Sequence, residues 1–336
     1  MAVSSESGGL MIAEIGEQPD VLARLLEHRD EFAAVRSEVA KRAPRFVLFA
    51  ARGTSDHAAL YAKYLVEIEL GKPAGLVSPS TLTVYGSRPD LSDVLMIAVS
   101  QSGGSPDLVD SLTAARSCGA LTVAVTNASS SPLASAAELH VDIRAGAERA
   151  VAATKSYTAQ LLALHLLLVG DEDTQLLPER AAQTLARTAA IELALRYRFA
   201  DRLITTARGY SYATAREAAL KLMETSYLSA QAFSAADLLH GPLAMIDSGV
   251  PVIAVVSPGR GGRAMSEALE RLTDAGADIA RIGPSDGVAV ITDGVPERLL
   301  PILEILPLQQ LAWRLALDRG TDPDHPRGLH KATSTW

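Results

Sequence analysis

The sequence predicts an α/β protein built from two tandem copies of one domain, each with a parallel β-sheet that helices flank on both faces. Short apolar runs alternate with helical patterns, as they do where helices join the strands of a parallel sheet. The chain also repeats itself. Ala51–Ser55 (ARGTS) recurs as Ala207–Ser211 (ARGYS), 156 residues further along. Val94–Gly103 recurs as Val250–Gly259 at the same offset and in the same order, which chance would rarely give.

The individual elements follow this alternation along the chain. Met11–Arg42 is helical in pattern and is broken near Pro19. A helix is expected from Ala58 onward, and another opens at Pro106, which suits a first helical turn. A further helix without Gly or Pro covers Ala213–Tyr227. The predicted strands are Arg45–Ala50, Leu95–Val99, Leu121–Val125 and Leu139–Ile143.

Composition and charge argue against several classes of protein. A net charge of −8 and a pI near 5.4 disfavour nucleic acid or an anionic membrane as the main partner. The longest apolar run, Leu161–Gly170, is too short to span a bilayer, and no signal peptide is recognised at the N-terminus. The single cysteine, Cys118, permits no internal disulfide. We therefore expect a cytoplasmic protein with no nucleic-acid and no membrane partner.

A Ser/Gly-rich turn follows one predicted strand and opens the next helix. This turn, Ser100–Asp107 (SQSGGSPD), offers backbone amides at a helix N-terminus beside hydroxyl and amide side chains, which suits a phosphate monoester. It has neither a Walker lysine nor the dinucleotide glycine spacing, so nucleotides fit poorly. The alternative is a helix-capping loop that binds nothing. Thr54 and Ser55 would face the same crevice, whereas Ser257–Gly262 in the second copy is expected to be a connecting loop.

Three charged side chains lie on one face of the helix predicted over Ala213–Tyr227. Glu217, Lys221 and Glu224 are spaced four and three residues apart. His240 follows at a Gly-Pro turn. A carboxylate, an ammonium and an imidazole are the groups that proton shuttling on a small substrate needs. The alternative is a surface ion pair between Glu217 and Lys221 with a histidine at a helix end.

Several separate motifs, in the same order, resemble a known family. Gly53–Ser55, the turn Ser100–Gly103 and Val151–Lys155 (VAATK) are similar to the first domain of tandem sugar isomerase (SIS) proteins. Ala219–Asp247 and Gly320–Lys331 resemble the isomerase half of glucosamine-6-phosphate synthase and its stand-alone deaminase-like relatives. The resemblance covers nearly the whole chain. It implies two SIS domains and a C-terminal tail over the active site.

The resemblance also implies roles for particular residues. Glu224 would be the base that moves a proton between carbons 1 and 2, and His240, from the partner subunit of a homodimer, would open the sugar ring. Lys221 would meet the open-chain carbonyl, and Lys331 would close over the sugar-phosphate substrate with the tail. The implied phosphate-binding residues are Ser100, Gln101, Ser102, Ser105, Thr54 and Ser55, and the other implied substrate-binding residues are Gly53, Val151 and Ala153.

The chain departs from the family pattern at a few places. The synthase carries an N-terminal glutaminase, whereas this chain reaches the isomerase motifs almost at once, so we expect no ammonia from glutamine. Gly104 replaces an acidic residue, and Ala153 replaces a serine whose hydrogen bond we expect to be lost or remade by Ser156. The expected segments are a flexible tail (1–10), a sugar-phosphate-binding domain (11–190), a domain with the catalytic helix (191–320) and an active-site tail (321–336).

Three functions remain open at this point. The leading one is isomerising deamination of glucosamine 6-phosphate to fructose 6-phosphate and ammonia, with Glu224 as base. A lyase or dehydratase would use the same base to eliminate the carbon 3 hydroxyl of N-acetylglucosamine 6-phosphate. A non-catalytic sugar-phosphate sensor is disfavoured because no helix-turn-helix segment is recognised and the Glu/Lys/His/Lys set is complete.

We expect no metal and no cofactor, because the seven histidines are scattered without zinc-type spacing. Some residues of the same regions receive no role from the sequence. They are Glu217, His57, Arg327, His330 and Trp336.

Overall fold

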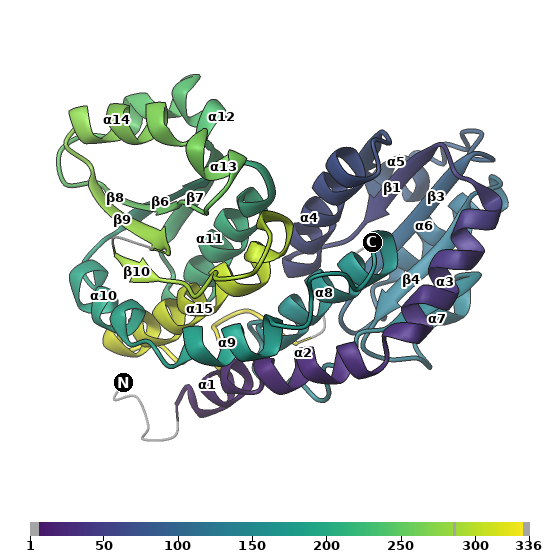
Figure 1. The fold of residues 1–336 in the computed structure, drawn as a ribbon, viewed down its shortest axis with the longest axis horizontal. Coiled ribbons are helices and arrows are strands. Elements are labelled where there is room, and N and C mark those ends of the chain that lie inside the picture. Colours follow the sequence, from purple (N-terminus) through teal and green to yellow (C-terminus); the bar gives the residue numbers. More distant parts are fainter. Residues whose placement is uncertain (1–6, 285–286, 332–336) are drawn as a thin grey trace. The chain divides into compact units, whose positions relative to one another are not determined.

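Two compact α/β units make up the computed structural model, which describes residues 7–284 and 287–331 (Figure 1). We call them the first unit and the second unit. The first unit comprises Val21–Glu148, Lys155–Glu172 and the segment from His330 on. The second unit comprises the chain up to Asp20, Arg149–Thr154 and Asp173–Leu329. Each unit holds one five-stranded sheet with helices on both faces, so the predicted fold class is confirmed.

The first unit contains the strands and helices of the N-terminal half. Its elements are α2 (Gln18–Glu27), most of which belongs to this unit, α3 (Arg29–Arg42), β1 (Phe46–Ala50), α4 (Thr54–Glu69), β2 (Ala74–Leu76), α5 (Pro79–Thr83), β3 (Val94–Ser100), α6 (Pro106–Ser117), β4 (Leu121–Thr126), α7 (Pro132–Ala136), β5 (Leu139–Asp142) and α8 (Lys155–Leu168).

The sheet of the first unit is parallel throughout, with strand order β2-β1-β3-β4-β5. Helices α3, α4 and α8 pack on one face, and α5, α6 and α7 pack on the other. Strands β3 and β4 are therefore buried along almost their whole length, as their unbroken apolar runs predict. Helix α8 is buried at every position, which explains its apolar sequence. In the described part of the chain, no helix is both long and apolar enough to cross a bilayer.

The second unit contains the remaining elements. They are α1 (Gly9–Gly16), α9 (Leu177–Leu185), α10 (Ala189–Tyr197), β6 (Arg202–Ala207), η1 (Gly209–Ser211), α11 (Tyr212–Ser226), β7 (Ser229–Ser234), α12 (Ala235–Leu239), η2 (Pro242–Met245), β8 (Pro251–Val255), α13 (Arg260–Arg263), α14 (Ser266–Asp274), β9 (Asp278–Gly283), β10 (Val288–Ala289), η3 (Glu297–Leu299) and α15 (Leu300–Asp318).

The sheet of the second unit is also parallel, with strand order β10-β9-β8-β6-β7. Figure 1 shows α12, α13 and α14 on one side of this sheet and α11 and α15 on the other. Helices α1, α9 and α10 pack against α15. The buried helix α15 thus supports α11, the helix on which the sequence places the catalytic residues.

The two sheets have the same topology, which confirms the internal duplication. Read from the other edge, the second sheet runs β7-β6-β8-β9-β10, in direct correspondence with β2-β1-β3-β4-β5. In each sheet the chain reverses its direction of growth between the first strand and its neighbour, β1 and β3 in one and β6 and β8 in the other. Ligands of open α/β sheets bind at this switch point, beyond the carboxyl ends of the strands.

Some elements differ from the sequence expectation. Helix α4 begins at Thr54 and not at Ala58, because Gly53 turns the chain at once with a φ of 54°. The turn at Ser257–Gly262 is not only a connecting loop, since it leads into the short helix α13. Strands β2, β7 and β10 were not predicted, because β2 and β10 are only three and two residues long and β7 (SAQAFS) is interrupted by polar residues.

The N-terminal segment and the domain limits also differ from the expectation or go beyond it. Helix α1 begins at Gly9, inside the segment 1–10 that we expected to be a tail, and residues 1–6 lie outside the described residues. The two compact units interleave along the chain, whereas the predicted domains are contiguous. The limits at 190 and 320 therefore stay predictions about domain organisation.

Candidate functional site

The turn between β3 and α6 lies at the switch point of the first sheet and is held by its own side chains. Ser100 Oγ accepts a hydrogen bond from the amide of Gly103 at 3.1 Å, and Ser102 Oγ accepts one from Gly104 at 3.3 Å. Gly103 has a φ of 63°, and a Cβ there would lie 2.2 Å from Ser131 Oγ. The position therefore requires glycine. Ser105, the residue before α6, does not use its hydroxyl to cap the helix.

A pocket of about 310 Å³ opens beside this turn, at the carboxyl ends of β1 and β3. It brings together most of the side chains that the sequence assigned to the phosphate, with Lys331 from the C-terminal tail. Thr54, which the sequence also assigned there, begins α4 and is not among the residues that line the pocket. The lining residues are Arg52, Gly53, Ser55, Val99, Ser100, Gln101, Ser102, Ser105, Leu108 and Lys331.

Sequence reasoning missed several residues that support this pocket. Arg52 donates to the buried carboxylate of Asp107 at 2.8 Å and so fixes the end of β1 to the first turn of α6. Gln160 Nε2, from α8, donates to Ser55 Oγ at 2.9 Å. The recurrence of Ala-Arg-Gly-x-Ser in both copies was the available signal for Arg52. Gln160 carried no comparable signal, because it lies within a long apolar helix.

In the second unit, α11 carries the predicted trio of charged residues on one face. Lys221 is fully buried, and its Nζ lies 2.5 Å from Glu224 Oε2 and 3.3 Å from Glu217 Oε1. Glu217 is fully buried as well, whereas the side chain of Glu224 is 22% exposed. The alternative of a surface ion pair between Glu217 and Lys221 is therefore excluded. Glu224 is the member of the trio that a small molecule can reach.

Opposing forces act on the ammonium of Lys221. Burial alone would lower its pKa, but the negative charges of Glu217 and Glu224 and their hydrogen bonds raise the pKa of Lys221 above its usual value. A permanent cation thus sits directly behind the accessible carboxylate. This arrangement can accept a proton at Glu224 Oε1 or Oε2 and can stabilise negative charge that develops next to Lys221.

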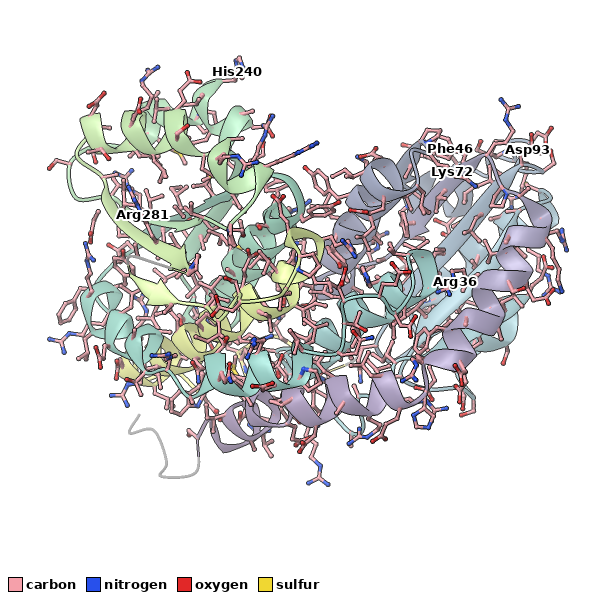
Figure 2. The ribbon with its side chains drawn as sticks, viewed as in Figure 1. Arg36, Phe46, Lys72, Asp93, His240 and Arg281 are labelled. Atoms are coloured by element: carbon pink, nitrogen blue, oxygen red, sulfur yellow. The ribbon has the colours of Figure 1, made fainter. Side chains whose placement is uncertain are left out.

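His240 lies elsewhere in the second unit. It follows the C-terminus of α12 and is exposed, and Figure 2 shows it at the outer tip of the unit, away from α11. The imidazole of His240 makes no hydrogen bond to any of the described residues. Of the other implied substrate-binding residues in this unit, Val151 donates its backbone N–H to Asp324 O at 3.1 Å, and Ala153 is half-buried. A single chain therefore does not bring His240 to Glu224.

The C-terminal segment is tied to the end of α11. Thr321 Oγ1 donates to Thr225 O at 2.7 Å, and the amide of Arg327 donates to Tyr227 Oη at 2.8 Å. The guanidinium of Arg327 also stacks over the ring of Tyr227, 4.3 Å from its centroid. Arg327 thus anchors the tail within the second unit and is not among the residues that line the pocket beside the turn after β3.

The switch point of the second sheet is occupied by the protein's own carboxylates. Glu297 accepts hydrogen bonds from the amides of Arg260 at 2.9 Å and Gly261 at 2.6 Å, at the position where the first unit has the turn between β3 and α6. Behind it, the buried Glu304 accepts hydrogen bonds from Ser211 at 3.0 Å and from Ser257. Burial raises the pKa of Glu304 to about 8, although the hydrogen bonds to hydroxyl groups oppose this. In this second, equivalent crevice the amides of Arg260 and Gly261 are thus already bonded to a carboxylate of the protein.

The residues without an assigned role from sequence have different surroundings. His57 is buried in α4, and His330 is exposed. Glu217 holds Lys221, as described above. Ser156, expected to remake a substrate contact, instead donates its hydroxyl to Glu148 at 2.7 Å. Trp336 lies outside the described residues, and within those residues no group of three His, Cys, Asp or Glu is arranged to hold a metal ion.

Comparison with known proteins places these features in a family. The family model of the SIS domain matches residues 42–170 and 197–293. The glutamine–fructose-6-phosphate aminotransferase (isomerizing) of Methanothermobacter thermautotrophicus is 34% identical over 98% of this chain. The chain spans 58% of the length of that protein.

Solved structures agree with this assignment. A Silicibacter pomeroyi protein assigned as a phosphosugar isomerase is 34% identical and superposes with a TM-score of 0.82, covering 94% of this chain and 99% of its own. The glucosamine-6-phosphate deaminase of Thermotoga maritima, at 21% identity, shares the fold with a TM-score of 0.78, covering 97% of this chain and 99% of its own. From the matched domains and these similarities, we conclude that the chain belongs to the SIS domain family.

Proposed function

We propose that this protein is a phosphosugar isomerase that acts on a hexosamine 6-phosphate, converting glucosamine 6-phosphate to fructose 6-phosphate with release of ammonia. The observation that carries the proposal is the Lys221–Glu224 pair, in which a buried ammonium backs an accessible carboxylate. The similarity to isomerising aminotransferases of fructose 6-phosphate supports the substrate class.

The phosphate pocket of the first unit would hold the substrate's phosphate. The amides of the turn after β3 and the hydroxyls of Ser100, Ser102 and Ser105 would donate hydrogen bonds to its oxygens. Lys331 and Arg52 line the same pocket and would offset the negative charge. The turn itself carries no charged side chain ahead of Asp107, so much of the recognition would come from neutral donors.

The proton transfer would take place at Glu224. In the open-chain sugar, Glu224 would remove the proton from carbon 2, and the electrons would move to the carbonyl oxygen on carbon 1. The positive charge of Lys221, buried behind Glu224, would stabilise the negative charge that develops there. Return of a proton to carbon 1 would give the imine of fructose 6-phosphate. Water would then add to carbon 2 and expel ammonia, so the sum is glucosamine 6-phosphate plus water to fructose 6-phosphate plus ammonia.

Ring opening needs a proton donor at the ring oxygen, and His240 is our candidate. Because its imidazole is exposed and lies away from α11, we propose that His240 completes the active site of a partner subunit in a homodimer. Mixing an inactive Glu224→Gln protein with an inactive His240→Ala protein should then restore part of the activity. Absence of any restored activity in a mixture that forms dimers would argue against shared sites.

The test of the reaction is an assay with two substrates. We would incubate the protein with glucosamine 6-phosphate and with N-acetylglucosamine 6-phosphate, and follow ammonia enzymatically and water loss by mass spectrometry. The proposal predicts ammonia from the free amine only, and at least a hundredfold less with Glu224→Gln, the range expected for losing a general base. Glu267→Gln, on the exposed face of α14, is the control and should keep full activity.

Other outcomes would point elsewhere. A normal rate of ammonia release by Glu224→Gln would refute the role of this carboxylate. If the N-acetylated sugar lost water and kept its acetyl group, the reaction would be elimination at carbon 3 and not deamination. Binding of either sugar without any turnover would leave a sensor and not an enzyme.

A further inference from the structure

A buried carboxylate in the first unit binds the lysine at the end of the described chain. Glu148 lies between β5 and α8, and its side chain is fully buried. It accepts hydrogen bonds from Ser156 N at 3.0 Å, from Ser156 Oγ at 2.7 Å and from Lys331 Nζ at 2.8 Å. Burial alone would raise the pKa of Glu148, but the charge of Lys331 and these hydrogen bonds hold it below its usual value. A buried anion here therefore has a defined cationic partner.

The lysine that Glu148 binds also faces the sugar-phosphate pocket. Lys331 is one of the residues that line this pocket beside Ser100 and Ser102, and its side chain is 27% exposed. The other cation in the lining, Arg52, already donates to the buried Asp107. A lysine side chain has many rotamers, so an ordered position at a pocket requires something to hold it.

Ser156 holds the same carboxylate independently of the lysine. It contributes two donors from the first turn of α8, one from the backbone and one from the side chain, so Glu148 cannot rotate freely. Lys331 is 183 residues away in sequence, and its bond to Glu148 closes the end of the described chain onto the first unit. Glu148 is thus held by two donors of α8 in addition to Lys331.

We propose that Glu148 is a positioning residue that docks Lys331 into the sugar-phosphate pocket and holds its ammonium there as a fixed cation for the substrate. This inference rests on the proposed function only in its choice of ligand. The contact itself belongs to one unit of the chain. It extends the site by a residue that no sequence motif indicated, and it gives the C-terminal tail a defined receptor.

The experiment compares three variants of the full-length protein. Glu148→Gln keeps the size of the side chain and an acceptor for Ser156 but loses the charge, Glu148→Asp keeps the charge, and Lys331→Met removes the partner. Glu138→Gln, which alters the exposed pair with Arg42 in the same unit, is the matched control. Circular dichroism and thermal unfolding establish that each variant is folded.

The first readout does not depend on activity. Brief acetylation with an amine-reactive ester, followed by peptide mass spectrometry, measures how accessible Lys331 is relative to the exposed Lys41 of the same molecule. We expect Lys331 to be labelled about tenfold faster in Glu148→Gln than in the wild type, because a charge-assisted hydrogen bond is lost. Glu148→Asp should restore part of the protection. Equal labelling of Lys331 in wild type and Glu148→Gln would overturn the proposal.

The second readout is the affinity for inorganic phosphate, measured by calorimetry. Glu148→Gln and Lys331→Met should each weaken binding by about tenfold, and the double variant should be no weaker than Lys331→Met alone. Normal phosphate affinity in Glu148→Gln together with weak affinity in Lys331→Met would show that Lys331 works without Glu148 and would refute the proposal. If the wild type bound no phosphate, the proposed phosphate site would fail, and the labelling result would still decide the role of Glu148.

Discussion

At the scale of single residues, the ion-pair cluster on α11 combines two buried members with one that is partly exposed. Glu217 and Lys221 are fully buried, and removal of one partner of such a pair leaves an uncompensated charge in the interior. Glu224 lies at the edge of the cluster and is the part that solvent and small molecules reach. Stability and reactivity should therefore respond differently to substitutions at neighbouring positions of one helix.

Lys221→Met is expected to destabilise the fold strongly. It leaves two carboxylates close together without their cation, and we expect the free energy of unfolding to fall by about 3–5 kcal/mol. Chemical denaturation measures this change. The control is Lys63→Met, which breaks a pair of the same four-residue spacing with Glu67 on α4, where both side chains are partly exposed, and should cost less than about 1 kcal/mol. Similar losses in the two variants would contradict the buried character of the α11 cluster.

Glu304 makes the stability of the protein depend on pH. Its pKa is raised to about 8 from a usual 4.5 because it is buried, and Glu297 adds a like charge. The unfolded chain loses this proton at a lower pH than the folded protein does. The contribution of protonated Glu304 to the free energy of unfolding is therefore complete below pH 4.5, the usual pKa of a glutamate, and is lost as the pH rises toward 8.

Glu304→Gln removes this titration and keeps a group that can bond to the same hydroxyls. Between pH 4.5 and 8, the free energy of unfolding should therefore fall more steeply with pH in the wild type than in the variant. Urea denaturation at several pH values gives the two slopes. Parallel slopes would mean that Glu304 does not hold its proton in the folded protein.

At the scale of elements, the turn between β3 and α6 is the most demanding piece of local structure. Gly103→Ala would place a Cβ 2.2 Å from Ser131 Oγ at a φ of 63°, and we expect a loss of about 1–3 kcal/mol in stability and of most phosphate affinity. Gly104→Ala is the control, because the nearest atom would be Ser102 Oγ at 3.7 Å and the φ is not in the left-handed region. Calorimetric titration with phosphate compares the two variants. Equal affinities would show that the turn does not bind the ligand.

The sequence predicted the elements that have strong local patterns. Helix α11, strands β1, β3, β4 and β5, and the helix that opens at Pro106 all appear within a few residues of their expected limits. The three-residue β2 was missed because its pattern is too short to distinguish from a turn. The start of α4 was placed four residues late because the conformation of Gly53 is not visible in a propensity pattern.

The candidate site was predictable only where a motif or a repeat marked it. The serines of the turn and the trio on α11 followed from spacing and from the resemblance to SIS proteins. The supporting residues Glu148 and Gln160 did not, because their partners lie 183 and 105 residues away in sequence. Whether the predicted residues bind and transform a substrate stays a prediction.

At the scale of the whole molecule, the two copies of the fold differ at their switch points. The turn in the first unit borders an open pocket, whereas in the second unit the corresponding backbone amides are bonded to a glutamate of the protein, Glu297. The two copies of the fold therefore differ at this turn, which borders a pocket only in the first unit among the described pockets. The second unit carries the helix with Lys221 and Glu224.

This asymmetry predicts the binding stoichiometry. The inactive Glu224→Gln variant should bind one equivalent of glucosamine 6-phosphate per chain. A second equivalent is not expected, because the amides of the second crevice are bonded to the protein's own Glu297. Isothermal titration calorimetry with a known active fraction measures the value. Two equivalents of similar affinity per chain would show that Glu297 yields to the ligand and that the units are not specialised.

The most direct test of the central claim is proton exchange at carbon 2 of the substrate. Glucosamine 6-phosphate is incubated with the protein in deuterated water, and the sugar is analysed by nuclear magnetic resonance for deuterium at carbons 1 and 2. The account predicts incorporation with the wild type and a loss of at least a hundredfold with Glu224→Gln, in a variant that still binds the sugar phosphate. Incorporation at the wild-type rate in Glu224→Gln would contradict it.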